Sequence, residues 1–127
     1  MTIFSIFNIF RPYFLRRRQQ AYYKIIRPLE NDRILDVGGD IDFWKMDKER
    51  KSHITFVNPL LPLEALDEKQ FSFIQGDGRH LPCSDKEYDI VFSNSTIEHV
   101  GTFEDQQRFA DEIRRVGKRY WVQTPNR

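Results

Sequence analysis

Short apolar runs separated by polar turns recur along most of the chain. Runs of this kind, rich in β-branched and aromatic residues, occupy positions 33–37, 53–57, 71–75, 88–92 and 119–124. Runs of this length that are bounded by glycine, proline, asparagine or aspartate are typical of strands. The run at 88–92 is almost continuously apolar, which suits a strand buried on both faces of a parallel sheet. The pattern therefore predicts five strands.

The segments before and between these runs are predicted to be helices. Between positions 19 and 29, apolar side chains recur at helical intervals until Pro28 ends the pattern. Shorter helices are expected at 43–46 and 60–69. Strands that alternate with helices predict an α/β fold built on a parallel sheet.

The segment from Thr102 to Gly117 carries several helical signals at once. Thr102 suits the N-cap, and Asp105, three residues later, nearly completes a capping box. Gly117 suits the C-terminal stop. One helix face is expected to be apolar, and it is made of Phe103, Phe109, Ala110, Ile113 and Val116.

Residues 1–29 form an N-terminal apolar and basic segment that is expected to be helical. Its first 15 residues are mostly Ile, Phe, Tyr and Leu, and they are followed at once by Arg16, Arg17 and Arg18. This apolar stretch is too short to span a bilayer, which needs about 20 residues. Two interpretations remain open: a helix packed on the domain, or membrane-surface contact through residues 1–18, with the arginines facing lipid phosphates.

Length and composition limit the kinds of protein that the chain can be. At 127 residues it suits one domain, with the core expected at 30–127. Its 20 basic and 19 acidic residues nearly cancel, so the charge gives no reason to expect a nucleic-acid partner. Cys83 is the single cysteine, and no Cys/His cluster has zinc-ligand spacing. A cytoplasmic location and no structural metal are therefore expected.

Candidate binding residues follow the ends of the predicted strands. Asp36 lies near the end of the first strand, and Gly38 and Gly39 follow where the chain must turn. Glycine lets a backbone approach a bulky ligand closely, as in strand–loop–helix units that hold nucleotide-like cofactors. Asn58 and Pro59 end the second strand, about 20 positions past the glycines, where such folds contact ribose hydroxyls.

The third and fourth predicted strands also end in polar groups. Asp77 and Gly78 follow the third strand, and Asn94 lies between two serines after the fourth. A loop aspartate either binds a ligand or caps its own turn, so Asp77 has two interpretations. Asn58 has two as well, because its amide can bond ribose hydroxyls or only shape the turn before Pro59.

These motifs, in this order and spacing, resemble those of class I S-adenosylmethionine-dependent methyltransferases of the type 11 kind. The matching blocks are Asp-x-Gly-Gly at 36–39 and the segments 76–82, 88–95 and 97–100. The first block departs from that family at Asp40, where a further glycine is usual. The resemblance implies a Rossmann-like doubly wound parallel sheet of about five strands in the order 3-2-1-4-5, with the family's C-terminal antiparallel strands missing.

The same resemblance implies a cofactor and a set of residues that bind it. The cofactor is S-adenosyl-L-methionine, and Asp77 takes the position that accepts a hydrogen bond from the adenine amino group. The implied cofactor-binding residues are Asp36, Gly38, Gly39, Asn58, Pro59, Asp77, Gly78 and Asn94. A nicotinamide-dependent dehydrogenase is disfavoured, because its Gly-x-Gly-x-x-Gly spacing is absent.

The function implied by the resemblance is methyl transfer to a small-molecule acceptor. Such transfer depends mainly on in-line positioning, and a base is needed only when the acceptor loses a proton. No catalytic residue is therefore assigned, although Glu98 and His99 are an adjacent acid and imidazole. The alternative is a truncated, non-catalytic remnant or binding module. An exposed fifth strand would also offer an edge for oligomer formation.

Overall fold

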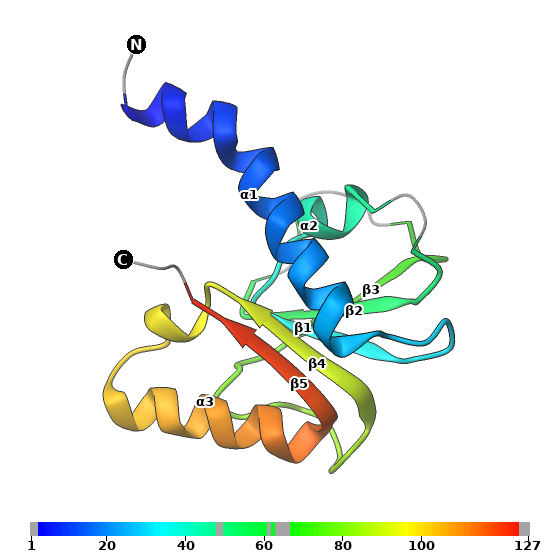
Figure 1. Cartoon of the computed structure of the whole chain (residues 1–127). Helices are drawn as coiled ribbons and strands as arrows, with labels where there is room; N and C mark the ends of the chain where they lie inside the picture. Colours follow the sequence, from blue (N-terminus) through cyan, green and yellow to red (C-terminus); the bar gives the residue numbers. More distant parts are fainter. Residues whose placement is uncertain (1–2, 48–49, 61, 63–66, 125–127) are drawn as a thin grey trace.

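A five-stranded parallel sheet with the order β3-β2-β1-β4-β5 lies at the centre of the structure (Figure 1). This computed structural model describes residues 3–47, 50–60, 62 and 67–124, with side chains from residue 12 onward. The strands are β1 (Ile34–Val37), β2 (Ile54–Asn58), β3 (Phe71–Gln75), β4 (Tyr88–Asn94) and β5 (Gly117–Gln123). The strand order is the predicted one, so the Rossmann-like fold class is confirmed.

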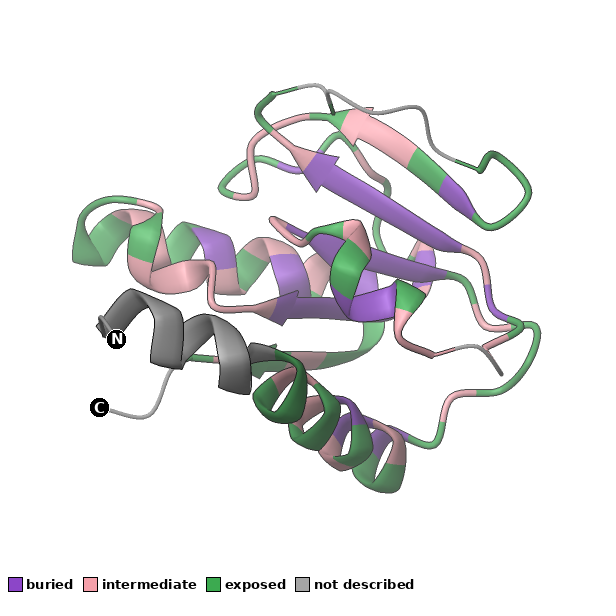
Figure 2. Cartoon of the chain, turned by 90° about the horizontal axis from the view of Figure 1, so that it is seen from above, coloured by how far each residue is buried: buried purple, intermediate pink, exposed green. Residues whose placement is uncertain are grey.

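The inner strands of the sheet are largely buried, as their apolar composition predicts. Every residue of β1 is buried, and the central strands are the main purple elements of Figure 2. In the register of the sheet, Ile34 of β1 pairs with Ile54 of β2 on one side and with Ile90 of β4 on the other. All strands run parallel, so their carboxyl ends meet at one edge of the sheet.

Helices cover both faces of the sheet (Figure 1). The helices α1 (Ile3–Ile26) and α2 (Ile41–Lys45) pack on one face, whereas α3 (Phe103–Val116) packs on the other. A short 3₁₀ helix, η1 (Ile97–His99), connects β4 to α3. The α1 face has an aromatic core that includes Tyr22, Phe43, Trp44, Phe56 and Phe92. The α3 face has a largely aliphatic core that includes Leu35, Val37, Val91, Ile113 and Val116.

The second half of α1 packs on the sheet, while its first half extends away from it (Figure 1). Tyr22 is fully buried, and its ring lies edge-on to Trp44 at 5.8 Å and to Phe92 at 5.1 Å between centroids. The helix ends at Ile26, and Arg27 takes a left-handed φ of 52° before Pro28. Among the helices that the structure describes, none combines the length and apolarity needed to cross a bilayer.

The predicted N-terminal cap of α3 is confirmed, but one residue was assigned to the wrong face. Asp105 N donates to Thr102 Oγ1 at 3.2 Å, and Thr102 N donates to Asp105 Oδ2 at 3.0 Å. Phe103 was expected on the buried face, yet its side chain is 76% exposed. Six helical residues rotate a side chain by about 600°, which places Phe103 about 120° away from Phe109. Gly117 has an extended φ of −98° and begins β5, so it is not a left-handed cap.

The helix after the glycine loop begins earlier than expected. It was predicted at 43–46, but α2 begins at Ile41 because Asp40 caps it, its Oδ1 accepting from Asp42 N at 3.0 Å. The helix predicted at 60–69 falls largely outside the described residues, and 68–70 form a turn. Asp40 thus replaces a glycine of the resembled family with a helix cap.

Candidate functional site

The loops that leave β1, β2, β3 and β4 border three hollows, one of which has a volume of about 580 Å³ and is lined by residues that include Gly39, Asn58 and Pro59. The other two hollows are neighbours. The larger, which we call the α1 hollow, has a volume of about 790 Å³ and is lined by residues that include Phe14, Arg18, Asp36, Gly38, Gly39 and Asn94. The smaller, which we call the α3 hollow, has about 450 Å³ and is lined by residues that include Gly38, Asn58, Pro59, Asp77, Gly78 and Phe109. Gly38 and Ser95 line both hollows, so the hollows lie side by side along the loop that follows β1.

Asp36 is a buried carboxylate at the wall of the α1 hollow. Its residue is only 1% exposed, and Trp44 Nε1 donates a hydrogen bond to Oδ2 at 2.7 Å. Among the described residues, no donor bonds the other oxygen, Oδ1. Burial raises the pKa of Asp36 to about 8, although the Trp44 hydrogen bond acts in the opposite direction. A buried carboxylate with an unpaired oxygen suits a cationic group of a ligand.

The two glycines after β1 leave no room for side chains. Gly38 has a φ of +79°, and a Cβ there would overlap the side chain of Thr96. At Gly39 a Cβ would overlap the carboxylate of Asp36. Glycine at both positions therefore keeps the turn tight and leaves the loop backbone next to both hollows.

Asn58 ties the end of β2 to the glycine loop. Its Nδ2 donates to the backbone oxygen of Gly39 at 3.0 Å, and Gly38 N donates to Val57 O at 2.9 Å. Asn58 and Pro59 also line the α3 hollow. The structure thus shows a role for Asn58 in shaping the loop, while its binding of ribose hydroxyls stays a prediction.

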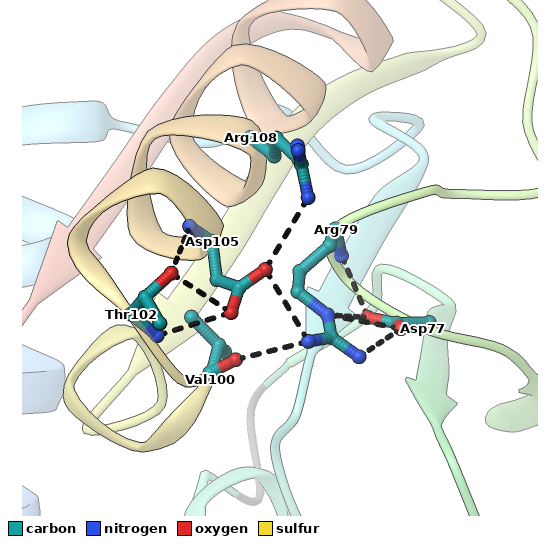
Figure 3. A network of polar contacts seen from close by, with 6 residues as sticks. All are labelled: Asp77, Arg79, Val100, Thr102, Asp105 and Arg108. Carbon is teal, nitrogen blue, oxygen red and sulfur yellow. Dashed lines mark hydrogen bonds and ion pairs between the residues drawn. The ribbon is translucent and has the colours of Figure 1, made fainter.

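Asp77 is paired with Arg79 at the α3 hollow (Figure 3). Arg79 Nη2 donates to Asp77 Oδ2 at 2.7 Å, and Arg79 Nε donates to both carboxylate oxygens at 3.0 Å. These hydrogen bonds lower the pKa of Asp77 from its ordinary value. Arg79 Nη1 also lies 3.4 Å from Asp105 Oδ1, which connects this loop to the start of α3. Arg79 N also donates to Asp77 Oδ1 at 2.9 Å, so four contacts from Arg79 occupy the carboxylate, which has about four acceptor positions.

Gly78 holds the same loop close to α3. A Cβ at this position would lie 2.5 Å from Phe109 Cε2 and 2.9 Å from Val37 Cγ1. Phe109 is fully buried beneath it. A larger residue at position 78 would therefore push the loop away from the core or force Phe109 to move.

Arg18 is a residue of the α1 hollow that the sequence analysis did not assign to the site. Its Nη1 donates to Asn94 Oδ1 at 2.9 Å and to Ser95 Oγ at 3.0 Å, which joins α1 to the end of β4. Arg18 precedes the buried Tyr22 by four residues, a spacing that places both on one helix face. That spacing was the signal in the sequence that could have identified Arg18.

The turns that leave the first three strands converge, as the sequence predicts. Gly38, Asn58 and Asp77 all line the α3 hollow, although they follow three different strands. The other predicted residues lie around the same two hollows, namely Asp36, Gly39, Pro59, Gly78 and Asn94. The structure therefore places all the predicted residues at one edge of the sheet, and their contact with a ligand stays a prediction.

This arrangement defines a class of protein, the Rossmann-like α/β proteins that bind ligands at the carboxyl ends of their strands. A model of a family described as a methyltransferase domain matches residues 45–120. More than half of the sequence is matched, so the chain belongs to this family of class I S-adenosylmethionine-dependent methyltransferases. No curated protein sequence matches the chain.

Similar solved structures share the fold at low sequence identity. A protein from Anabaena variabilis, described as a methyltransferase of antibiotic biosynthesis, is 19% identical over 84% of this chain and 44% of its own, with a TM-score of 0.68. An S-adenosylmethionine-dependent methyltransferase from Methanosarcina mazei is 18% identical over 79% and 56% of the two chains, with a TM-score of 0.62. The present chain thus spans about half the length of these structures.

A third similar structure contains bound ligands. It is the 1,6-didemethyltoxoflavin-N1-methyltransferase from Burkholderia thailandensis, with 1,6-didemethyltoxoflavin and S-adenosylhomocysteine bound. It is 14% identical over 85% of this chain and 50% of its own, with a TM-score of 0.67. At 14% identity, the similarity shows that the two proteins share a fold.

Proposed function

We propose that the chain binds S-adenosylmethionine across the two hollows and that its function is methyl transfer to a small-molecule acceptor. The observation that carries the proposal is the convergence of Gly38, Asn58 and Asp77 on one hollow. Membership of the methyltransferase domain family supplies the chemistry. When bound, this cofactor supplies a methyl group on a positively charged sulfur.

The side chains around the hollows fit the parts of such a cofactor. In the α3 hollow, Asp77 would accept from the adenine amino group in exchange for one of its contacts with Arg79, and Asn58 offers an amide for ribose hydroxyls. In the α1 hollow, the unpartnered Oδ1 of Asp36 suits a cationic group. Gly38 lines both hollows, and a Cβ there would overlap Thr96, so only glycine keeps the loop in this position beside an extended ligand.

The reaction needs positioning more than acid–base chemistry. A methyl group on sulfur is transferred when the acceptor attacks in line, and a base is required only if the acceptor must lose a proton. His99 lines the α3 hollow rather than the α1 hollow, and its Nε2 lies 3.7 Å from Glu98 Oε1. This position beside the proposed adenosine site does not favour His99 as the base for the acceptor.

Calorimetric titration with S-adenosylmethionine and S-adenosylhomocysteine tests this proposal. We expect dissociation constants in the micromolar range, and no binding at millimolar ligand would contradict the proposal. Asp77→Ala should weaken binding by about 1–3 kcal/mol, because a buried donor of the ligand would lose its acceptor. Asp111→Ala is the matched control, since Asp111 is an exposed aspartate of α3 that lies outside both hollows.

A turnover assay run beside the titration separates an enzyme from a binding module. A methyltransferase should convert bound S-adenosylmethionine to S-adenosylhomocysteine in the presence of a suitable member of a panel of small acceptors. Micromolar binding with no conversion across such a panel would favour the binding module over the enzyme.

A further inference from the structure

One side of α1 carries an apolar stripe that lies opposite the side packed on the sheet. The stripe recurs at helical spacing along the first half of the helix, at Ile3, Ile6, Phe7, Phe10, Tyr13 and Phe14. Tyr13 precedes the buried Tyr22 by nine residues, or about two and a half turns, so the two lie on opposite sides of the helix. Tyr13 and Phe14 are 55% and 52% exposed, which agrees with this placement.

The stripe begins in the half of α1 that extends away from the sheet (Figure 1). Residues 3–10 contain no charged residue, and their two polar residues are Ser5 and Asn8. Asn8 precedes the buried Ile26 by about five full turns, so its position continues the packed side of the helix. A helix that packs on a domain along its whole length is apolar on that side. The first half of α1 has most of its apolar positions on the other side, which suits a partner outside the domain.

α1 is strongly basic, whereas the rest of the chain is acidic. Five basic residues and no acidic one lie between Ile3 and Ile26, and the whole chain has a net charge of +1, so the remaining residues carry −4. Arg16, Arg17 and Lys24 are exposed, and the Arg17 guanidinium lies 5.9 Å from the centroid of the Tyr13 ring. Exposed cations beside aromatic rings suit the boundary between anionic lipid headgroups and acyl chains.

We propose that α1 binds the surface of an anionic membrane through its apolar stripe and its exposed cations, with the helix lying in the plane of the interface. An interfacial helix needs only one apolar side, so the stripe is buried in lipid without α1 crossing the bilayer. A second copy of the chain is the poorer partner, because two helices with five basic residues each and no acidic one repel each other. This inference is independent of the proposed function.

Co-sedimentation of the full chain with lipid vesicles tests the proposal. The vesicles are pure phosphatidylcholine, which is neutral, and equal parts of phosphatidylcholine and phosphatidylglycerol, which are anionic. Binding to the anionic vesicles should be at least about tenfold tighter, because several exposed cations lie close to the lipid phosphates. Added salt should weaken this binding by screening the charges. Equal binding to both vesicles, or none to the anionic vesicles at low salt, would overturn the proposal.

Phe10→Ser tests the apolar stripe itself. Phe10 lies within the stripe, so the variant should bind anionic vesicles about tenfold more weakly, because the burial of a phenylalanine in lipid is lost. Phe4→Ser is the matched control, since Phe4 precedes Tyr22 by about five full turns and so lies on the packed side. Its affinity should stay within about twofold of wild type. Equal losses in the two variants would show that the stripe does not face the lipid.

Sedimentation velocity without lipid tests whether the stripe binds a second copy of the chain instead. The oligomeric state should be the same for wild type and Phe10→Ser, because the proposal assigns the stripe to lipid. A wild-type dimer that Phe10→Ser converts to a monomer would overturn the proposal. The comparison of the two vesicles uses only the wild-type chain, so it tests the proposal even if Phe10→Ser does not fold.

Discussion

Asp36 carries a free-energy cost that a purely structural residue would avoid. One of its oxygens accepts from Trp44, and the other has no partner among the described residues although it is buried. An unsatisfied buried polar atom costs about 1–3 kcal/mol. Such a cost is typical of a site at which a ligand supplies the missing partner. The burial of Asp36 therefore supports its placement in the binding site.

The raised pKa of Asp36 predicts a particular dependence of stability on pH. The pKa is about 8 in the folded protein against 3.8 in the reference state, so between these values the folded chain holds a proton that the unfolded chain has lost. The contribution of this proton to the free energy of unfolding is fully present below about pH 4 and is lost as the pH rises to about 8. Asp36→Asn removes this titration. As the pH rises between about 4 and 8, the free energy of unfolding of the variant should therefore increase relative to that of wild type by at most about 1.4 kcal/mol per pH unit.

Denaturant unfolding of both proteins between pH 5 and pH 8.5 measures this effect. The wild-type free energy of unfolding should fall across the range relative to that of the variant. Parallel profiles for the two proteins would show that Asp36 titrates with an ordinary pKa. The comparison uses only the difference between the proteins, so other titrating groups cancel to first order.

At the residue scale, the sequence predicts the position of residues at strand ends better than that of residues on a helix that packs against the site. Asp36, Gly38, Asn58 and Asp77 were all identified, because parallel strands carry their C-terminal residues to one edge. Arg18 was not assigned to the site, because its four-residue spacing from Tyr22, which distinguishes it from Arg16 and Arg17, was not considered. The contact of Arg18 with Asn94 joins residues 76 positions apart, a relation that only the fold establishes.

Among the elements, α1 packs on the sheet through several residues, of which Tyr22 is the most deeply buried. Tyr22 is fully buried among the rings of the α1-face core, and Arg18 lies one turn before it on the same helix. Tyr22→Ala should lower the free energy of unfolding by about 3–5 kcal/mol, the range for large aromatic truncations in cores. Because α1 forms a wall of the α1 hollow, the affinity for S-adenosylhomocysteine should fall as well.

Urea unfolding followed by circular dichroism measures the effect of Tyr22→Ala. Ile25→Ala on the same helix is the control, because Ile25 is 65% exposed and should cost less than about 1 kcal/mol. Similar losses for the two variants would contradict the packing of α1 through Tyr22.

Strand positions were predicted more accurately than helix boundaries. The predicted third strand at 71–75 coincides with β3, because its apolar composition and flanking turns depend on the local sequence. The start of α2 was placed too late, since Asp40 was considered as a substituted glycine and not as a helix cap. Phe103 was assigned to the wrong face because its apolar side chain was counted without the full rotation along α3.

For the whole molecule, the alternation of strands and helices predicted the α/β fold with a parallel sheet. The strand order, which the structure confirms, was implied by the resemblance to the methyltransferase family. It did not predict that α1 would supply a wall of the site, because this depends on how the helix docks against β4. β5 forms an edge of the sheet in the described part of the chain, and Tyr120 and Val122 on it are 51% and 40% exposed. The use of this edge strand for oligomer formation stays a prediction.

The central claim is that the two hollows on either side of the glycine loop form a single binding site for an adenosyl amino acid. Two-dimensional amide NMR of the labelled chain, titrated with S-adenosylhomocysteine, tests it most directly. We predict saturable shifts with one dissociation constant at Gly38, Asn58, Asp77 and Ser95, which line the two hollows. Shifts that cluster instead at the separate hollow between Leu29 and Ser52, or no shifts at millimolar ligand, would contradict the claim.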